Sequence, residues 1–318
     1  MRDLQADVQQ AWEIRKIFKP EIGFFIPGAK HYENDWYSNS PFSFVHLSVT
    51  GEACAGRCAH CNGALLKGMM ATATPQAMHS VVDDLLKKGC RGILVSGGSN
   101  ADGEVPLQPF AEEMGYAKRK GLTVLVHSGL IRRETAAMLK EAGVDQVLMD
   151  VIGDEETIHK VCHLDRKPDD YLQSMLCCRE IGLAIAPHIV IGLHFGQICG
   201  EWRSLEMIRR ADPESIVLVI LAPARGTAMA GIQPPSMDVV TAIMAAARIG
   251  HPETPIALGC ARPPGPYKRQ AELNAIDCGL NGIAYPDETT VAYAKSKGLK
   301  PVFLEECCSL LGMSPIAH

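Results

Sequence analysis

Cys54, Cys58 and Cys61 follow one another with the spacing C-x3-C-x2-C, directly after residues 42–50. The alternating and β-branched pattern of that run predicts a buried strand. Three thiolates on one short loop can hold three corners of a [4Fe–4S] cluster, whereas a cluster that only carries electrons usually has four cysteine ligands. The fourth iron would be open to another ligand. A structural zinc site is the alternative, but the triplet lacks the paired C-x2-C or nearby His ligand that closes such a site.

A second group of cysteines could hold a further cluster. Cys260 ends a strand-like run, and Arg262 has the same parity, so we expect it on the same side and take it as the candidate catalytic residue. Cys307 and Cys308 lie in a C-terminal segment that could fold back over one end of the fold. Two adjacent cysteines usually cannot face one cluster without a bend. Even so, Cys260 with one or both of them could ligate a second iron–sulfur cluster.

The other cysteines carry less information. Cys162 is ambiguous, and the rest lie on predicted helices or beside glycines that close helices, where a small buried thiol is the usual role. Twelve cysteines in a chain whose polar N-terminus shows no export signal argue against a disulfide framework. The buried thiols are expected at Cys90, Cys177, Cys178, Cys199 and Cys278.

One repeating unit must position these groups: a strand, a loop, a helix and a closing glycine. Glycine just past a helix end supplies the left-handed residue that closes the last turn, and such glycines are expected at Gly89, Gly121, Gly143, Gly182, Gly250, Gly279 and Gly298. The clearest helix is 75–88, with Thr74 as its cap and Pro75 in its first turn. Apolar strands alternate with these helices and fall at 42–50, 92–95, 122–126, 147–149, 185–191, 216–221, 255–258 and 282–284.

Eight strand-helix units predict an α/β protein with a parallel sheet that closes into a (βα)8 TIM-type barrel. An open, doubly wound sheet is the alternative. The 318 residues suit a barrel, which takes about 250 residues plus extensions. We expect an N-terminal helix and connector at 1–41, the barrel at 42–286, and a C-terminal helix with a cysteine-containing tail at 287–318.

Barrel active sites lie at the C-terminal ends of the strands, and further polar or glycine residues are expected there. A Gly-Gly pair after a strand is also a frequent tight turn, and a strand-end Asp is as often a helix cap. A histidine on an apolar strand is more often a hydrogen-bonded core residue than a functional one. In chain order the candidates are Gly97, Gly98, Ser99, Ser128, Asp150 and His188.

Composition excludes two classes of partner. Hydrophobic residues make up 47% of the chain and charged residues 21%, which is typical of a globular protein with a large core. The net charge of −5 gives no basic surface for nucleic acid. The longest apolar run, 182–196, is too short and too polar to span a bilayer. A cytoplasmic protein that binds neither nucleic acid nor membrane is expected.

The cysteine spacing resembles that of the radical S-adenosylmethionine (SAM) superfamily, in which a residue with a π-face precedes the third cysteine, as His60 does here. The resemblance implies that the open iron binds SAM. It also implies that the backbone of Gly97 and Gly98 approaches the methionine part, although Ser99 stands where Glu is common. By the same resemblance, Ser128 and Asp150 would contact ribose or substrate, and His188 would lie near the adenine.

Longer strings over residues 42–308 resemble the biotin synthase-related branch of the superfamily. Within that branch they are most similar to one subunit of the two-component, archaeal-type lipoyl synthase. These strings are 48–51, 61–63, 96–99, 187–194, 259–263 and 305–308.

This resemblance implies a reaction. The first cluster would cleave SAM to methionine and a 5′-deoxyadenosyl radical, which would remove hydrogen from an octanoyl chain on a lipoyl-carrier protein. The auxiliary cluster would supply sulfur. The implied partners are the octanoylated carrier, a homologous second synthase subunit, and an electron donor such as ferredoxin or flavodoxin.

Three other functions stay open. A hydrogenase-maturase-like or mutase-like enzyme would form the radical without transferring sulfur. A biotin synthase-like enzyme would sulfurate a free small molecule. A non-enzymatic iron–sulfur or zinc module would not bind SAM, and a whole barrel is more than such a module needs.

Overall fold

A computed structural model describes residues 3–316 of the chain. Its centre is one sheet in which every strand pairing is parallel, with the order β11-β1-β10-β9-β8-β7-β6-β5-β4-β2-β3. The strands are β1 (Glu21–Phe25), β2 (Phe44–Ser48), β3 (Met70–Ala71), β4 (Gly92–Ser96), β5 (Thr123–His127), β6 (Gln146–Asp150), β7 (Ala184–Ile191), β8 (Ile216–Ile220), β9 (Ile256–Leu258), β10 (Gly282–Ala284) and β11 (Lys300–Leu304).

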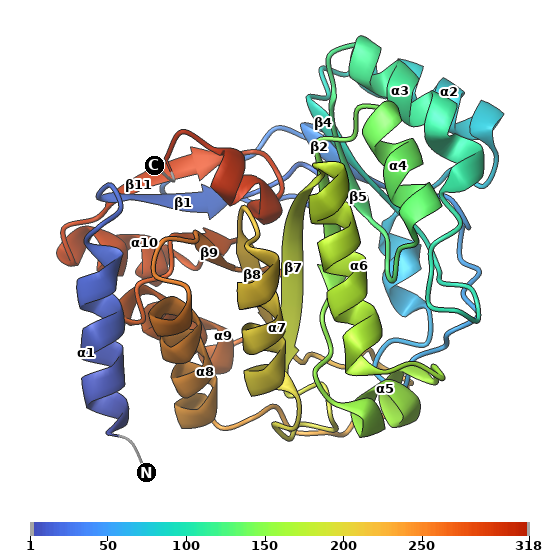
Figure 1. Cartoon of the computed structure of the whole chain (residues 1–318). Helices are drawn as coiled ribbons and strands as arrows, with labels where there is room; N and C mark the ends of the chain where they lie inside the picture. The colour runs from blue at the N-terminus through green and yellow to red at the C-terminus, as the bar shows by residue number, and fades with distance from the viewer. Residues whose placement is uncertain (1–2, 317–318) are drawn as a thin grey trace.

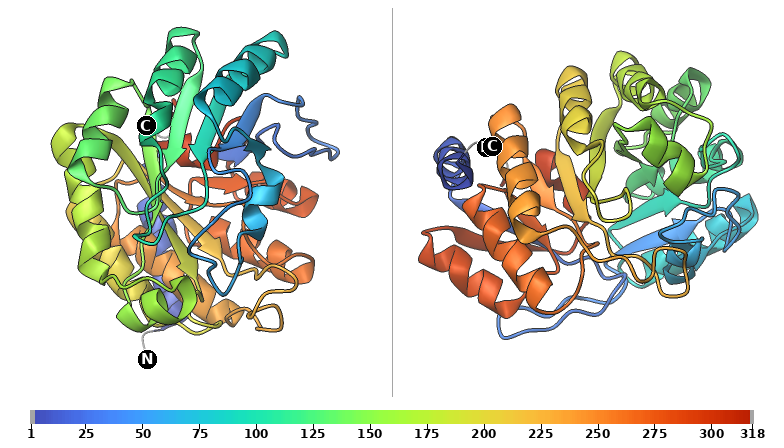
Figure 2. Two further views of the ribbon diagram at one scale, coloured as in Figure 1. Left: turned by 90° about the vertical axis from the view of Figure 1, so that its right-hand side faces the viewer. Right: turned by 90° about the horizontal axis from the view of Figure 1, so that it is seen from below.

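The helices lie along the outer side of this sheet, which curls into a half-barrel (Figures 1 and 2). The α-helices are α1 (Leu4–Arg15), α2 (Pro75–Lys87), α3 (Ala111–Arg119), α4 (Arg133–Glu141), α5 (Glu155–Cys162), α6 (Pro168–Ile181), α7 (Glu201–Ala211), α8 (Met237–Gly250), α9 (Pro266–Asp277) and α10 (Glu288–Ser296). Three short 3-10 helices are η1 (Ala64–Gly68), η2 (Gln108–Phe110) and η3 (Cys308–Met313).

Helix α2 shows how local sequence signals produce these elements. The Thr74 side chain accepts a hydrogen bond from the Ala77 N–H at 3.2 Å, and Pro75 occupies the first turn, as predicted. A cap of this kind stabilises a helix by about 1 kcal/mol. Of the predicted closing glycines, all but Gly250 have positive φ. Gly250 is instead the last residue of α8.

All eight predicted barrel strands form, as β2 and β4–β10, but the expected closed barrel is not confirmed. Closure would require β10 to pair with β2. Instead β10 pairs with β1, and the outer edge of β2 pairs with β3. The cause is residues 21–25, which lie between Pro20 and Pro27 in the stretch expected to be a connector and form a strand there.

Both ends of the chain join this sheet. Strand β1 lies between β10 and β11, so the sheet extends across the expected boundaries at 41 and 286. After β11 the tail turns onto the inner face, where η3 covers the end of the sheet at which β8 begins (Figure 1). There the Ser215 hydroxyl donates to Ser309 O at 2.7 Å, and Leu310 packs against Phe44 and Leu125. Among residues 3–316 no helix has the length and apolarity to cross a bilayer.

Candidate metal centre

The cysteine loop follows β2 and gathers its donor atoms around one glycine. The Sγ atoms of Cys58 and Cys61 and one ring nitrogen of His60 all lie within 4.8 Å of one another. A Cβ added to Gly56 would lie 3.7 Å from Cys58 Sγ and 3.9 Å from Cys54 Sγ. Glycine at this position therefore leaves a space between two thiols of the triplet that any other residue would fill.

Segments from two other parts of the sheet hold this loop in place. The Ala59 N–H donates to Val161 O at 2.7 Å, at the end of α5, and the Ala224 N–H, after β8, donates to His60 O at 2.8 Å. The ring of His163, the residue that ends α5, contacts Gly56 O at 3.2 Å. Backbone hydrogen bonds thus fix the two residues between Cys58 and Cys61 from two different segments.

The turn after β4 packs directly against the same loop. The Gly98 N–H donates to Thr50 Oγ1 at 2.7 Å, and the Ala55 N–H donates to Ser99 O at 2.9 Å. A Cβ on Gly98 would lie 2.0 Å from Ala53 O, which no real side chain tolerates. The Gly-Gly turn, predicted to approach a cofactor, therefore also positions the thiols, with Ser99 Oγ at 3.9 Å from Cys54 Sγ.

The donor set fits a metal cluster. A hydrogen bond with Cys162 raises the pKa of Cys58 to about 12, and one with Cys58 raises the pKa of Cys61 to about 12. Metal binding would have to displace these protons, because the thiolate is the ligand. Nδ1 of His60 is buried and lacks a hydrogen-bond partner among the described residues. Zinc was set aside from the sequence because the triplet lacked a nearby histidine ligand. Since His60 does lie beside Cys58 and Cys61, that reason no longer holds.

Three polar side chains meet on the inner face: His127 and Asp150 are the last residues of β5 and β6, and His188 lies within β7. His127 and His188 form an edge-to-face ring pair at 5.4 Å, and His127 Nε2 lies 3.9 Å from Asp150 Oδ1. Burial lowers the pKa of His188 to about 4, so the ring is neutral at neutral pH. Of the strand end 127–129 we chose Ser128 as the site residue, but it is His127 that alternates with Leu125 in β5 and lies on the inner face. Ser128 differs: it is buried, and its hydroxyl donates to Gly129 O at 2.9 Å.

Cys260 and the pair Cys307 and Cys308 influence one another electrostatically, although the pair comes 47 and 48 residues later in the chain. A hydrogen bond from Cys308 lowers the pKa of Cys307 to about 7, and the Ser309 hydroxyl donates to Cys307 Sγ at 3.2 Å. Cys260 is exposed and Cys307 half-buried. Among the described residues these three thiols are not one of the groups whose donor atoms all lie within 4.8 Å of one another, so a second cluster on them stays a prediction.

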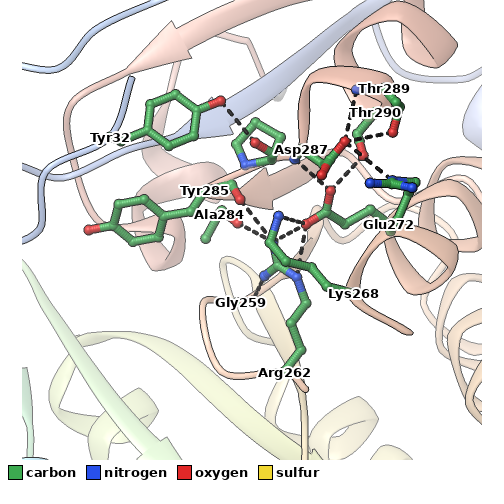
Figure 3. A network of polar contacts seen from close by, with 12 residues as sticks. Tyr32, Gly259, Arg262, Lys268, Glu272, Ala284, Tyr285, Asp287, Thr289 and Thr290 are labelled. Carbon is green, nitrogen blue, oxygen red and sulfur yellow. Dashed lines mark hydrogen bonds and ion pairs between the residues drawn. The ribbon is translucent and has the colours of Figure 1, made fainter. Parts of the chain in front are cut away.

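Arg262 is engaged by the protein itself (Figure 3). Its Nε and Nη2 contact Glu272 Oε1 at 3.1 and 2.5 Å, Nη2 also donates to Ala284 O, and Nη1 donates to Gly259 O. The side chains of Arg262 and Glu272 are 1% and 0% exposed. The guanidinium therefore fastens the Cys260 turn to α9 and to the end of β10. This geometry is that of a positioning residue, whereas a catalytic role was predicted.

The structure is thus an α/β protein with a curled parallel sheet and a three-cysteine loop at the carboxyl end of strand β2. Residues 48–197 match the family model of the radical SAM superfamily. Over this part, just under half of the chain, the protein matches the radical SAM superfamily, and its biotin synthase relatives are at low identity. This superfamily implies a [4Fe–4S] cluster and SAM, which the cysteine loop and its glycine-lined space fit.

Two curated relatives illustrate the similarity. Biotin synthase from Geobacillus thermodenitrificans (strain NG80-2) is 26% identical over 223 residues, which cover 66% of this chain and 64% of that protein. Biotin synthase from Prochlorococcus marinus subsp. pastoris (strain CCMP1986 / NIES-2087 / MED4) is 24% identical over 251 residues, covering 76% and 73%. The match thus spans less than two thirds of the first relative.

Solved structures share the fold. Methylornithine synthase (PylB) superposes with a TM-score of 0.64 at 15% identity, covering 94% of this chain and 89% of that one. HydG, a maturase of the [FeFe]-hydrogenase, superposes with a TM-score of 0.67 at 14% identity, covering 98% and 72%. At these identities the likeness concerns the fold alone.

Proposed function

We propose that this protein is a radical SAM sulfurtransferase that inserts sulfur into an octanoyl chain bound to a carrier protein, as one of two subunits of a lipoyl synthase. The observation that carries the proposal is the second group of thiols. Cys260, Cys307 and Cys308 lie on the inner face with Tyr285, whose pKa is raised by burial and by these three thiols. A second iron–sulfur cluster on these cysteines would be the sulfur donor.

The cysteine loop follows the carboxyl end of β2, and Cys260 follows the carboxyl end of β9. Cys307 instead packs with Leu94 against the apolar layer of Phe44 and Leu125. His127, Asp150 and His188 lie two residues further along their strands than Leu125, Leu148 and Ala186 of that layer. We take the space beside these polar residues as the place for the substrate carbon.

When bound, the [4Fe–4S] cluster and SAM supply a carbon-centred radical that can remove hydrogen from an unreactive C–H bond. The chain's own residues hold and enclose the reacting groups. Gly56 and Gly98 allow the cysteine loop to pack closely against the turn after β4. The ring of His188 is neutral and so adds no charge to a site that must hold an apolar alkyl chain. Exclusion of water protects such a radical from side reactions.

Three partners belong to this proposal: the octanoylated lipoyl-carrier protein, a homologous second synthase subunit, and a ferredoxin or flavodoxin that reduces the first cluster. Two sulfur insertions divided between two related proteins are the reason for the second subunit. In this proposal the bound carrier or second subunit covers the open side of the sheet between its edge strands β3 and β11.

Iron counting on the anaerobically reconstituted protein tests the sulfur donor. We expect about eight irons per chain, because each of two [4Fe–4S] clusters holds four. Cys260→Ser and Cys307→Ser should each lower the count to about four and abolish sulfur transfer, while deoxyadenosine formation persists. Cys177→Ser, on α6, is the matched control and should keep all the iron. A count of about four in the unchanged protein would refute sulfur insertion from a second cluster.

The biotin synthase relatives favour a second candidate, sulfur insertion into a free small molecule. It keeps both groups of thiols and needs no carrier. Incubation with an octanoylated carrier domain and, separately, with free octanoyl amide separates the two. Sulfur on the carrier-bound chain alone supports the first proposal, and sulfur on the free amide alone supports the second.

A further inference from the structure

Three potential metal ligands meet away from both groups of cysteines discussed so far. Asp154, His194 and Cys199 each present one donor atom, and these atoms all lie within 4.8 Å of one another. Asp154 is the residue that caps α5, after β6. His194 and Cys199 lie on the loop between β7 and α7. Cys199 is exposed, so an ion could reach the group from solvent.

The two loops that carry these ligands are packed against each other without room for side chains. A Cβ on Gly153 would lie 2.2 Å from Gly200 O, and one on Gly200 would lie 2.6 Å from Asp154 N. The Glu201 carboxylate accepts hydrogen bonds from the N–H groups of Gly192, Cys199 and Gly200 at 2.7 to 3.1 Å. The backbone beside each ligand is therefore fixed, as a preorganised metal site requires.

Neighbouring groups orient two of the ligands. Thr157 Oγ1 donates to Asp154 Oδ2 at 2.6 Å and lies 2.9 Å from His194 Nδ1. The Thr157 N–H also donates to Asp154 Oδ2 at 2.7 Å, which leaves the second carboxylate oxygen for a cation. Outer contacts of this kind set the direction of metal ligands.

The local charge favours a cation. Asp154 is a ligand of the group, and the Glu201 carboxylate, 5% exposed, contacts the Cys199 backbone. Glu156 is already paired with Lys160. A divalent ion would offset the two carboxylates of Asp154 and Glu201.

We infer that Asp154, His194 and Cys199 bind one zinc-like divalent cation that joins the loops after β6 and β7. A carboxylate, an imidazole and a thiolate are the ligand types that Zn²⁺ takes, and three protein ligands leave a fourth, open position for water. Because the ion joins the β6 and β7 loops beside the inner-face histidines, it would stiffen the rim of the site. The inference does not depend on the proposed sulfur transfer.

Equilibrium dialysis of the cluster-loaded protein against Zn²⁺, with metal analysis, tests this site while the cluster cysteines are occupied. We expect one zinc per chain. Loss of a single ligand should weaken binding by about 100-fold or more, since loss of an outer partner alone costs 10–100-fold. The variants are His194→Ala and Cys199→Ser, with Cys177→Ser as the control that should bind like the unchanged protein.

X-ray absorption at the zinc edge identifies the ligands. One sulfur at about 2.3 Å with nitrogen and oxygen near 2.0 Å is expected, and Cys199→Ser should remove the sulfur shell. Absence of bound zinc, binding that both variants retain, or a shell with two or more sulfurs would overturn the inference. The iron content of each variant checks its fold. Should His194→Ala fail to load the cluster, the exposed Cys199→Ser decides the question.

Discussion

Gly98 lies so close to Cys54 that a methyl group at position 98 would sit 2.5 Å from the Cys54 Cα atom. The contact joins the turn after β4 to the loop after β2, two segments that are far apart in sequence and adjacent in the sheet. The glycine backbone therefore sets where the first thiol of the triplet stands.

Gly98→Ala should displace the cysteine loop. A shift of about 1 Å at a reacting centre can cost about 100-fold in rate, and we expect a loss of that order in deoxyadenosine formation, with iron loading reduced. Gly68→Ala is the control, because a Cβ on Gly68 meets no atom within 4 Å. Equal activity of the two variants would show that the close approach is not needed.

Cys58→Ala should abolish deoxyadenosine formation under anaerobic, reducing conditions. The Cys58 thiol lies within 4.8 Å of the donor atoms of His60 and Cys61, so its loss removes one ligand of the metal site. Product analysis by chromatography, beside Cys177→Ala as the control, checks this. Retained formation in the Cys58 variant would contradict the radical SAM chemistry.

The buried pair of Arg262 and Glu272 should matter more for stability than an exposed pair. Glu272→Met leaves a buried guanidinium without its carboxylate, which typically costs about 3–5 kcal/mol of unfolding free energy. The double variant Arg262→Met, Glu272→Met should lose less, because the buried guanidinium is removed with its carboxylate and only the more exposed Lys268 loses its partner. Urea unfolding measures both.

Glu180→Gln is the matched control for that pair. Glu180 and Arg133 form an ion pair in which both side chains are 64% exposed, and such pairs contribute about 0–1 kcal/mol. Similar losses for Glu272→Met and Glu180→Gln would contradict the stabilising role of the buried pair.

His251 should make the protein sensitive to acid. Burial lowers its pKa from 6.5 to about 4, and its ring donates to Leu205 O at 3.1 Å. Between these two pKa values the unfolded chain binds a proton that the folded chain does not. Stability should therefore be complete above pH 6.5 and fall as the pH drops toward 4, by about 3 kcal/mol at 1.36 kcal/mol per pKa unit.

Urea unfolding at a series of pH values tests the His251 prediction. The variant His251→Gln should show a flatter dependence of unfolding free energy on pH between 6.5 and 4. His31, whose side chain is 76% exposed, supplies the control variant His31→Gln. An unchanged slope in the His251 variant would exclude this residue as the source of the acid sensitivity.

Local patterns predicted the elements well and their long-range pairings less well. Thr74, Pro75 and the apolar face of α2 could be recognised because capping and helical periodicity are properties of neighbouring residues. The pairing of residues 21–25 with 282–284 leaves no local signal, so the open sheet could not be distinguished from a closed barrel.

The candidate site divides in the same way. The cysteine triplet follows from its spacing, whereas the role of the Gly-Gly turn was expected only from the resemblance to the radical SAM superfamily. Arg262 has the expected position after β9, but whether its guanidinium faces substrate or Glu272 depends on α9, which comes later in the chain. At the end of β5 the choice fell on Ser128 and not on its neighbour His127, because which of the two side chains faces inward depends on where the strand ends.

The place of β1 in the sheet also bears on how the chain is made. Residues 21–25 leave the ribosome long before their two neighbours, β10 and β11, at 282–284 and 300–304. During synthesis the apolar strand Ile22 to Phe25 must stay unpaired until these later strands have emerged. An unpaired strand of this kind invites association with other chains. Slow translation or missing chaperones should therefore harm the yield of this protein before they harm its activity.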